Sequence, residues 1–587
     1  MSDSGLPGYT DFATGQTATP LHINDPNPVA VDVVSGDINS FNLTVPTFAQ
    51  ITVGGNTYNF NFTGQNVSPS QTTSINVAGD ITYCSDITSV PLATLLPSAL
   101  FATLPATLLN DVGSDPGLAT LQNVAENIQY EASTGALSFH GVMTSAEETF
   151  LLNPYELELN SSGKPVLDAN GQPLTEPLPL TAAQQAAIAV AIPQLYAASQ
   201  TATLGATGLV LAGPGHFEVT AGNIDLGSSD GIQVLSGNSA LAAISPYGAD
   251  LTINTSGSLD MTYSKVADEG LLGGIQLNIG GTLDVGSEIN PFSDPNAAVG
   301  IFTTGGGGIS ITATGDVDVD GSRIAAYDGG NINIRSTTGD VNAGTGGTGN
   351  VSLQGVYLNS QTGQLVSFDD SIPGSGIMAT ALPHAPAPLG NIVIGTPEGS
   401  INASKGGILQ IALNGANSQD SSITLNAGKD INATGSGIIG ANLQLTAGGS
   451  VNGVLVSTGE INVAAAVNAN VTAFAKGDVS ISATGDVTGT VMTAGSASVS
   501  GESITAALIS QSVATSGSTT GAAIGVPQSN VPKEDSKVAD DASTMAAMSN
   551  EIDSDDDKKK NNKTITLAQR SGRVTVILPG KKNTPHP

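Results

Sequence analysis

The sequence predicts an all-β protein whose main body is a right-handed parallel β-helix, also called a β-solenoid. Three observations point to this fold class. A short phrase built around Gly recurs along the chain. Aromatic residues are only 4% of the 587 residues and Trp is absent, so a compact core would lack its largest burial units. Charged residues are 11%, against roughly 25% in ordinary globular domains.

The recurring phrase consists of Gly, a small polar residue and an aliphatic–polar–aliphatic triplet. The triplet alternates with period two, which places its aliphatic residues on one face of a strand and its polar residues on the other. A strand this short buries its apolar face only when copies stack above and below it. Clear copies begin at Gly222, Gly257, Gly281, Gly315, Gly330, Gly339, Gly349, Gly390, Gly399, Gly459, Gly477 and Gly485.

Short steps between successive glycines favour a coil with several strands per turn over a series of hairpins. Three strands of about five residues with short corners give roughly 20 residues per turn. Residues 205–515 would then form about 15 turns and a rod of roughly 70 Å, at ~4.8 Å per turn. The right-handed sense follows from the crossover preference of parallel strands.

Composition divides the chain into six segments. The expected order is an irregular N-terminal segment, a β-rich segment continuous with the solenoid, a mixed insertion or capping subdomain with short helices, the β-helix, a disordered charged linker, and a C-terminal β-hairpin with a tail. These segments span residues 1–34, 35–87, 88–203, 204–525, 526–563 and 564–587.

The insertion carries two helix-start signals. Thr144-Ser-Ala-Glu147 and Thr181-Ala-Ala-Gln184 both match the capping box, in which the first and fourth residues cap each other's backbone N–H. The second signal opens a long apolar stretch that predicts a helix kinked or broken near Pro193.

The formal charge of the chain is −33. Nucleic-acid binding requires clustered Lys and Arg, and anionic lipid requires a basic surface, so both kinds of partner are excluded. Ten of the 17 basic residues follow residue 531, which makes the tail locally basic against an acidic body.

No segment is apolar and long enough for a membrane span, because prolines interrupt the longest apolar stretch, 91–109. The protein is therefore not expected to be integral to a membrane.

Export is not explained by the first residues, which lack the basic and apolar regions of a signal peptide. We nevertheless expect a secreted or bacterial cell-surface location, with the chain a fragment or shortened form of a larger exported protein. Cys84 is the only cysteine, which excludes an intrachain disulfide and favours a small core residue.

No motif predicts a catalytic set or a cofactor. Gly435-Ser-Gly-Ile-Ile-Gly440 matches a dinucleotide-binding pattern, but a strand-like sequence follows it where a helix is required, so we expect a solenoid corner. Asp316, Asp318 and Asp320 alternate along one predicted strand, ~7 Å apart on one face. They are weak candidates for a metal site, or for a carboxylate pair of a glycoside hydrolase; a solvated outer face is the favoured interpretation.

The repeated phrase, with stretches such as 427–453 and 313–326, resembles that of filamentous haemagglutinin-like exoproteins. The resemblance covers residues 35–85 and 205–515. It implies a large secreted or cell-surface β-helix used in adhesion and often exported by a two-partner route. This chain departs from the family pattern because it has no clear amino-terminal secretion domain.

Three functional hypotheses follow. The first is a non-catalytic adhesin-type protein that presents an extended surface to carbohydrate or to a receptor on a host or neighbouring cell. The second is a polysaccharide-active β-helix lyase or hydrolase that uses the three aspartates with Arg323, with Arg335 near the same face. The third is a self-assembling filament or scaffold, since solenoid ends expose unpaired strands.

Overall fold

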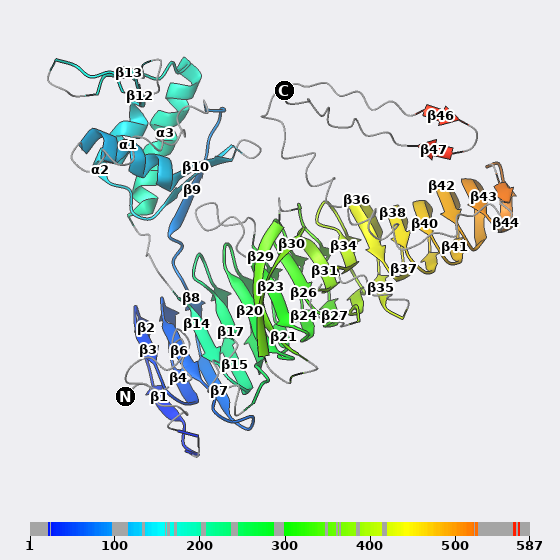
Figure 1. Ribbon diagram of the computed structural model, residues 1–587, viewed down its shortest axis with the longest axis horizontal. Coiled ribbons are helices and arrows are strands. Elements are labelled where there is room, and N and C mark those ends of the chain that lie inside the picture. The colour runs from blue at the N-terminus through cyan, green and yellow to red at the C-terminus, as the bar shows by residue number, and fades with distance from the viewer. Residues whose placement is uncertain are drawn as a thin grey trace, which may run out of the picture.

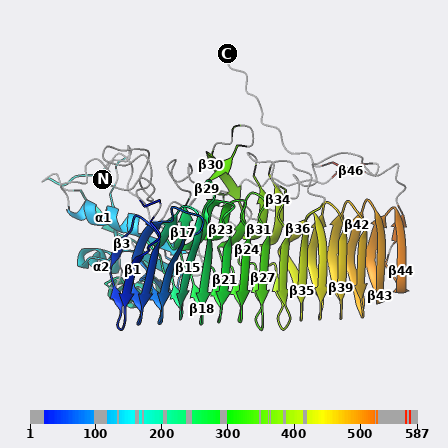
Figure 2. The ribbon, with the colours of Figure 1, turned by 90° about the horizontal axis from the view of Figure 1, so that it is seen from below.

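Three parallel sheets form one long coil in the computed structural model (Figure 1). Each turn contributes one strand to each sheet, and the strands run side by side along the coil in Figure 2. The fold is therefore the parallel β-helix that the sequence predicts. The structure describes residues 22–23, 25–96, 116–131, 135–158, 160, 165–169, 173–200, 207–235, 245–286, 299–346, 350–359, 362, 365–382, 388–413, 420–521, 523–525, 568–570 and 573–575.

The first sheet contains one strand from each of 15 turns. Twelve of these strands follow residue 214, where the repeat length predicted about 15 turns. The difference arises because several turns are much longer than 20 residues. The strands are β1 (Val29–Val33), β4 (Ala49–Val53), β7 (Thr72–Val77), β15 (Gly215–Ala221), β18 (Ala249–Thr255), β21 (Ile275–Ile279), β24 (Ile309–Ala313), β27 (Ile332–Ser336), β32 (Ile392–Thr396), β35 (Ser422–Ala427), β37 (Asn442–Ala447), β39 (Ile461–Ala465), β41 (Val479–Ala483), the start of β43 (Ser496–Ser510) and β44 (Ser512–Thr519).

The second sheet consists mostly of two-residue strands. Copies of the Gly phrase such as those at Gly222, Gly257 and Gly315 form strands of this sheet, whereas those at Gly330, Gly390, Gly459 and Gly477 form strands of the first sheet. The strands of the second sheet are β2 (Ile38–Asn39), β5 (Thr57–Tyr58), β8 (Ile81–Thr82), β16 (Ile224–Asp225), β19 (Leu259–Asp260), β22 (Leu283–Asp284), β25 (Val317–Asp318), β28 (Val341–Asn342), β33 (Ile401–Asn402), and the first parts of β36 (Ile431–Gly440), β38 (Val451–Ser457), β40 (Ala469–Ala475) and β42 (Asp486–Thr493).

The third sheet closes each turn. In the last turns its strands are continuous with those of the second sheet, so that one long strand serves both. The separate strands are β3 (Asn42–Thr44), β6 (Asn61–Gln65), β14 (Leu209–Ala212), β17 (Ile232–Leu235), β20 (Lys265–Leu271), β23 (Gly300–Gly305), β26 (Arg323–Ala326), β31 (Gly376–Ala381), β34 (Ile408–Ala412) and β45 (Ala523–Gly525).

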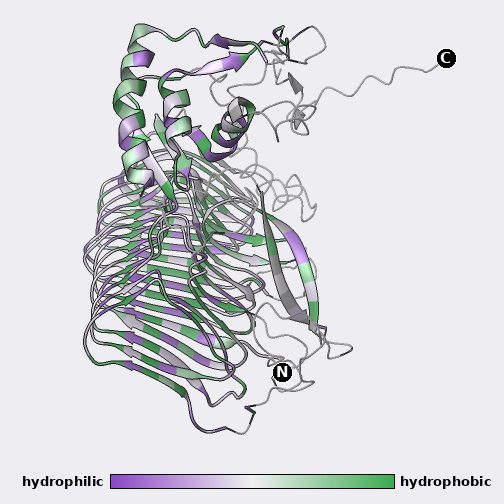
Figure 3. Ribbon diagram, turned by 90° about the vertical axis from the view of Figure 1, so that its left-hand side faces the viewer, coloured by the Kyte–Doolittle hydropathy of each residue, from purple (hydrophilic) through white to green (hydrophobic). Residues whose placement is uncertain are grey.

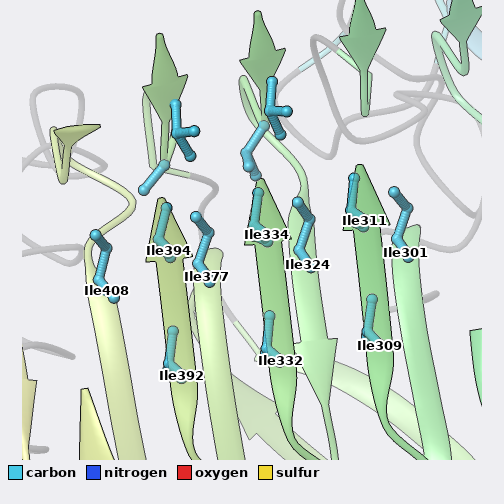
Figure 4. Close-up of a cluster of buried hydrophobic side chains, with 14 of the residues drawn as sticks. Ile301, Ile309, Ile311, Ile324, Ile332, Ile334, Ile377, Ile392, Ile394 and Ile408 are labelled. Carbon is cyan, nitrogen blue, oxygen red and sulfur yellow. The ribbon is translucent and has the colours of Figure 1, made fainter. Parts of the chain in front are cut away.

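Inward-facing aliphatic side chains from all three sheets fill the coil in stacked rows. Figure 4 shows Ile309, Ile332 and their neighbours aligned from turn to turn. Ile332 pairs in register with Ile392, which pairs with Ile423, and all three are fully buried. The core therefore grows along the axis without large aromatic residues at most levels.

The segment 35–87 is continuous with the solenoid, since β6, β7 and β8 pair with β14, β15 and β16 across the insertion. The expectation of an irregular segment 1–34 is wrong for Val29–Val33, which forms β1 in register with β4. Its alternation Val-Ala-Val-Asp-Val is short, and only the neighbouring turn completes its apolar contacts.

The insertion forms a separate small unit with its own core, beside the first turns in Figure 1. Both capping boxes are present, at Thr144 and Thr181. Of the predicted kink or break near Pro193, the break is wrong, because the last helix continues through this residue. The elements are β9 (Ile87–Pro91), α1 (Pro116–Asn127), β10 (Ile128–Glu131), β11 (Ala136–His140), α2 (Ser145–Leu152), β12 (Tyr155–Leu157), β13 (Thr175–Pro177) and α3 (Ala182–Ser199).

Two hairpins stand apart from the three sheets. An antiparallel pair, β29 (Asn350–Leu358) and β30 (Leu365–Pro373), interrupts one turn and lies along the flank of the coil in Figure 3. Near the C-terminus, β46 (Ala568–Arg570) pairs with β47 (Arg573–Thr575), within the segment predicted as a hairpin. The predicted linker 526–563 lies outside the described residues.

Among the described helices, none is long and apolar enough to cross a membrane.

Candidate functional site: the polar row of the second sheet

The small polar residue that follows Gly in the phrase holds successive turns together. Its side-chain oxygen accepts a hydrogen bond from the backbone N–H of the equivalent residue one turn further along. Asp316 Oδ1 accepts from Asp340 N at 2.6 Å, and Asp340 Oδ1 accepts from Ser400 N at 2.8 Å. Asp316, a candidate from the sequence, therefore has a structural role at a corner of the coil.

The polar residue of each two-residue strand faces outward, whereas its aliphatic neighbour is buried. In register, these outward residues form one continuous line, which we call the polar row. From β16 to the first part of β40 its members are Asp225, Asp260, Asp284, Asp318, Asn342, Asn402, Asn432, Asn452 and Asn470.

The C-terminal part of the polar row is a ladder of amides. Asn402 Nδ2 donates to Asn342 Oδ1 at 2.6 Å, Asn432 to Asn402 at 2.9 Å, and Asn452 to Asn432 at 3.0 Å. Asn342 Nδ2 in turn donates to Asp318 Oδ1 at 2.5 Å, which links the amides to the acidic part. Stacked Asn ladders of this kind stabilise in-register parallel strands.

The N-terminal part of the polar row places four aspartates on consecutive turns, at a spacing of ~4.8 Å. Each of the first three also caps its own corner, since Asp225, Asp260 and Asp284 accept from the backbone N–H two residues ahead at 3.0, 3.1 and 3.0 Å. This is the Asx-turn geometry that Asp favours. Part of their role is thus conformational.

Partial burial and mutual repulsion disfavour ionisation of these carboxyls. Burial raises the pKa of Asp225, and the Asp260 carboxylate adds to the effect. Burial likewise raises the pKa of Asp318, with further repulsion from Asp316 and Asp284, although the Asn342 amide opposes the shift. At neutral pH the acidic part of the row, Asp225 to Asp318, is a line of closely spaced negative charges.

The carboxyls of Asp284 and Asp320 interact across neighbouring turns. Burial raises the pKa of Asp284 to about 6, with added repulsion from Asp320 and Asp260 against the favourable Gly286 N–H. Burial also raises the pKa of Asp320, with added repulsion from Asp318 and Asp260 against an opposing contribution from the Asp284 carboxyl. Asp320 reaches its neighbour from a corner at which its backbone has φ = 49°, a conformation tolerated better by Asp than by most residues.

The three candidate aspartates alternate with the buried Val317 and Val319 and so all face outward, as predicted, but only Asp318 lies in a strand. Only Val317 and Asp318 form the strand β25; Asp316 caps the corner before it and Asp320 occupies the corner after it. The structure also brings Asp318 and Asp320 to Asp284, one turn below. Within the described residues, no three His, Cys, Asp or Glu side chains are grouped so as to hold a metal ion.

Sequence reasoning missed Asp225, Asp260 and Asp284, although a signal was present. Each occupies the same place in a copy of the phrase as Asp318 does in Gly315-Asp-Val-Asp-Val319. Alignment of the copies would have predicted the row, because equivalent positions of a solenoid repeat stack on one another.

The two arginines do not lie beside the row. Arg323 belongs to β26 of the third sheet, where it is buried and donates from Nη1 to the Tyr327 hydroxyl at 3.2 Å. Arg335 lies on β27 of the first sheet with its side chain exposed. The expectation that both could stack on one face near the aspartates is wrong, because the chain turns a corner between β25 and β26 and another between β26 and β27, which places the arginines on two other sheets.

The motif Gly435–Gly440 lies at the end of β36, and β37 follows it directly. Gly435 and Gly437 both adopt φ = 77°. The segment is thus a corner and strand of the coil, as expected, and has no helix N-terminus for a phosphate.

One further carboxyl is unusual because it lies inside the coil. Asp268 on β20 is fully buried; its Oδ1 accepts from Gly270 N at 2.9 Å, whereas its Oδ2 has no partner. Burial raises the pKa of Asp268 well above its ordinary value. A Cβ at Gly273 would lie 2.4 Å from this oxygen, so any larger residue there would displace the Asp268 carboxyl.

No protein-family model matches the chain, and no curated protein or solved structure matches it either. Its function is therefore inferred from the geometry above and from the sequence.

Proposed function

We propose that this chain is a non-catalytic β-helix protein of adhesin type, secreted or displayed at a bacterial cell surface, that binds an extended ligand along its polar row. The observation that carries this proposal is the amide ladder from Asn342 to Asn470, with one outward amide on each turn. The repeat resemblance to filamentous haemagglutinin-like exoproteins supports the same role.

The ladder leaves hydrogen-bonding capacity at each level. A side-chain amide has two N–H donors and an oxygen with two lone pairs. Asn402 and Asn432 each use one donor and one lone pair along the ladder. One donor and one acceptor per turn therefore remain for a ligand, repeated every ~4.8 Å.

A regular array of this kind suits a polymer with repeated hydroxyl groups, such as a polysaccharide. Each contact is weak on its own, because a net hydrogen bond in water contributes only about 1 kcal/mol. Several contacts made by one chain add by multivalency, without a deep pocket. Carbohydrate, free or on a surface receptor of a host or neighbouring cell, is the ligand class we propose.

The test is a glycan-array screen of the purified chain with and without calcium, run beside a reducing-end release assay on the same sugars. Binding without release is the expected result. Absence of glycan binding both with and without calcium would contradict the proposal.

A polysaccharide-active enzyme is the second candidate, and the coupled pair Asp284–Asp320 favours it. Glycoside hydrolases use a carboxyl with a raised pKa as acid together with a second, ionised carboxylate, and burial raises the pKa of Asp284 to about 6. Release of product in the same assay, and its loss in Asp284→Asn and Asp320→Asn, would support this candidate. Release that survives both substitutions would exclude these residues.

A further inference from the structure

The outer face of the third sheet carries a second continuous row, and this row is apolar. In register from the middle of the coil to its C-terminal end it contains Ala267, Phe302, Ala325, Met378, Leu409, Ile439, Val456, Phe474, Met492 and Ile509. We call the last four residues, Val456 to Ile509, the apolar stripe.

The first half of this row is covered. Phe302, Met378 and Leu409 are buried in a cluster with Leu353 and Ile372 of the hairpin β29–β30. β29 packs against β20 and β23, and Figure 3 shows the hairpin along the flank of the coil. An antiparallel hairpin is thus the element that this protein uses to cover the outer face of its third sheet.

The apolar stripe continues the same face without such a cover among the described residues. Phe474 is 38% exposed and Met492 is 43% exposed, whereas Val456 and Ile509 are half-buried. Large apolar residues that recur at one position of four successive turns form a contiguous patch, not scattered surface residues.

The C-terminal hairpin segment of the same chain has the properties of a cover for this stripe. Thr564-Ile-Thr-Leu567 and Val574-Thr-Val-Ile-Leu578 alternate apolar and polar residues, which predicts one apolar face. Between them, β46 and β47 pair in antiparallel register. The described strands of this segment thus form an antiparallel pair, as β29 and β30 do.

Chain length and charge both favour this occupant. The last strand of the third sheet, β45, ends at Gly525, and 567 − 525 = 42 residues separate it from β46. The stripe begins within a few turns of β45, at ~4.8 Å per turn, well within the reach of such a connection. Residues 558–587 contain eight basic and no acidic residues, whereas residues 1–557 contain nine basic and 50 acidic residues.

We propose that the C-terminal hairpin segment, residues 564–578, docks on the apolar stripe of its own molecule and covers the third sheet there as β29–β30 covers it in the middle of the coil. The apolar faces provide the contact, and attraction between the basic segment and the acidic body aligns them. This contact lies on another sheet than the polar row and does not depend on the proposed adhesive function.

Photo-crosslinking of the full chain tests this docking. Phe474 is replaced by p-benzoylphenylalanine, and the matched control carries the same group at Val393, which is also 38% exposed but lies on the first sheet. We expect crosslinks within one molecule from position 474 to peptides of 558–587, in at least fivefold excess over position 393. Crosslinks to the body of a second copy, or equal yields at both positions, would overturn the proposal.

A charge-reversal pair separates docking from chance contact of a tethered tail. The variant Arg570→Glu/Arg573→Glu is compared with Lys533→Glu/Lys537→Glu, which changes the charge equally outside the hairpin segment. The first variant should lower the crosslink yield at least threefold and the second should leave it within twofold. Added salt should lower the wild-type yield, since it screens exposed charges. Equal effects of the two variants would contradict specific docking.

Discussion

The turns before residue 413 and those after residue 420 share one core but differ in their corners. Successive turns near the C-terminus are offset by only 18 residues, as between Asn442 and Glu460, whereas earlier offsets reach 24, 35 and 60 residues. In the short turns the second and third sheets share continuous strands, such as β40 and β42. The late turns therefore contain few residues beyond those that form the sheets and the corners between them.

Backbone strain follows the same division. Among the described residues, every non-glycine residue with positive φ lies before residue 405, whereas corners after residue 420 use glycine. The strained positions are Ser40, Asn59, Thr262, Leu272, Asp320, Asp328 and Ser404. The buried charged groups Asp268 and Arg323 also belong to the earlier turns.

This division indicates where the molecule departs from the requirements of its fold. A regular solenoid turn needs stacked aliphatic residues, a polar corner residue and a flexible corner. Backbone strain and buried charges are not needed for such a turn. In proteins they concentrate at functional sites. The acidic part of the polar row lies among the irregular turns, whereas the amide ladder continues into the regular ones.

The largest expected effect is the loss of stability when a core isoleucine is truncated. This loss should be the same in the early turns and in the late turns. Ile332→Ala in an early turn and Ile481→Ala in a late turn each remove a side chain that is at most 1% exposed. Each should lower the free energy of unfolding by about 2–5 kcal/mol, as measured by chemical denaturation. Val393→Ala, at an exposed position, is the control. A loss in only one region would show that the two cores are not equivalent.

The glycine corners of the late turns should tolerate no side chain. Gly453 has φ = 107°, and a Cβ there would lie 2.1 Å from the Ala433 carbonyl oxygen. Gly453→Ala should therefore lower the free energy of unfolding by about 1–3 kcal/mol. Gly395→Ala is the matched control, since its Cβ would meet nothing within 4 Å. Equal stabilities of these variants would contradict the strain argument.

Removal of strain in an early corner should stabilise the protein. Leu272 has φ = 57° and is 60% exposed. Leu272→Gly relieves about 1–2 kcal/mol of left-handed strain and loses about 0.5–1 kcal/mol through the flexibility of glycine. The expected gain in free energy of unfolding is about 0.5–1 kcal/mol by denaturation. Leu95→Gly, at 59% exposure without positive φ, should lose stability instead.

The smallest effect concerns the acidic part of the polar row and depends on pH. The pKa of Asp284 is about 6 in the folded chain, above its ordinary value of 3.8. The folded state therefore holds a proton that the unfolded state has lost between these values, and stability falls as pH rises through this window. Asp284→Asn abolishes that fall.

At pH 7.5 the Asp284→Asn variant should be more stable than wild type by about 1 kcal/mol, after allowance for solvent screening. At pH 3.5 the difference should vanish, because both side chains are then neutral. Denaturation at the two pH values measures this, with Asp486→Asn in an exposed late-turn position as control. A gain that persists at pH 3.5 would contradict the electrostatic cause.

The fold was predictable because each copy of the Gly phrase indicates one strand, the residues that this strand buries and the corner beside it. Features that depend on contacts with other turns could not be predicted in this way. The strand β1 has too few apolar residues to be recognised without β4, and the length of the turns was underestimated where insertions such as β29–β30 interrupt them.

The candidate site was predicted only in part for the same reason. Asp318 and Asp320 were found from their local spacing, but their partner Asp284 lies one turn away and 34 residues back, since Asp284 pairs with Asp318. Arg323 looked adjacent in sequence and proved to lie on another sheet. Contacts between turns, not alternation within a strand, decide which side chains meet in a solenoid.

The most direct test of the polar row as a binding surface is a glycan array probed with two triple variants of equal size. One carries Asn402→Ala, Asn432→Ala and Asn452→Ala in the amide ladder; the other carries Thr424→Ala, Gln444→Ala and Asn462→Ala on outward positions of the first sheet. Thermal midpoints establish that both are folded. The glycan-binding signal of the ladder variant should be at least tenfold lower than that of wild type. The control variant should keep the wild-type signal. Equal signals from the two variants would contradict a binding role for the row.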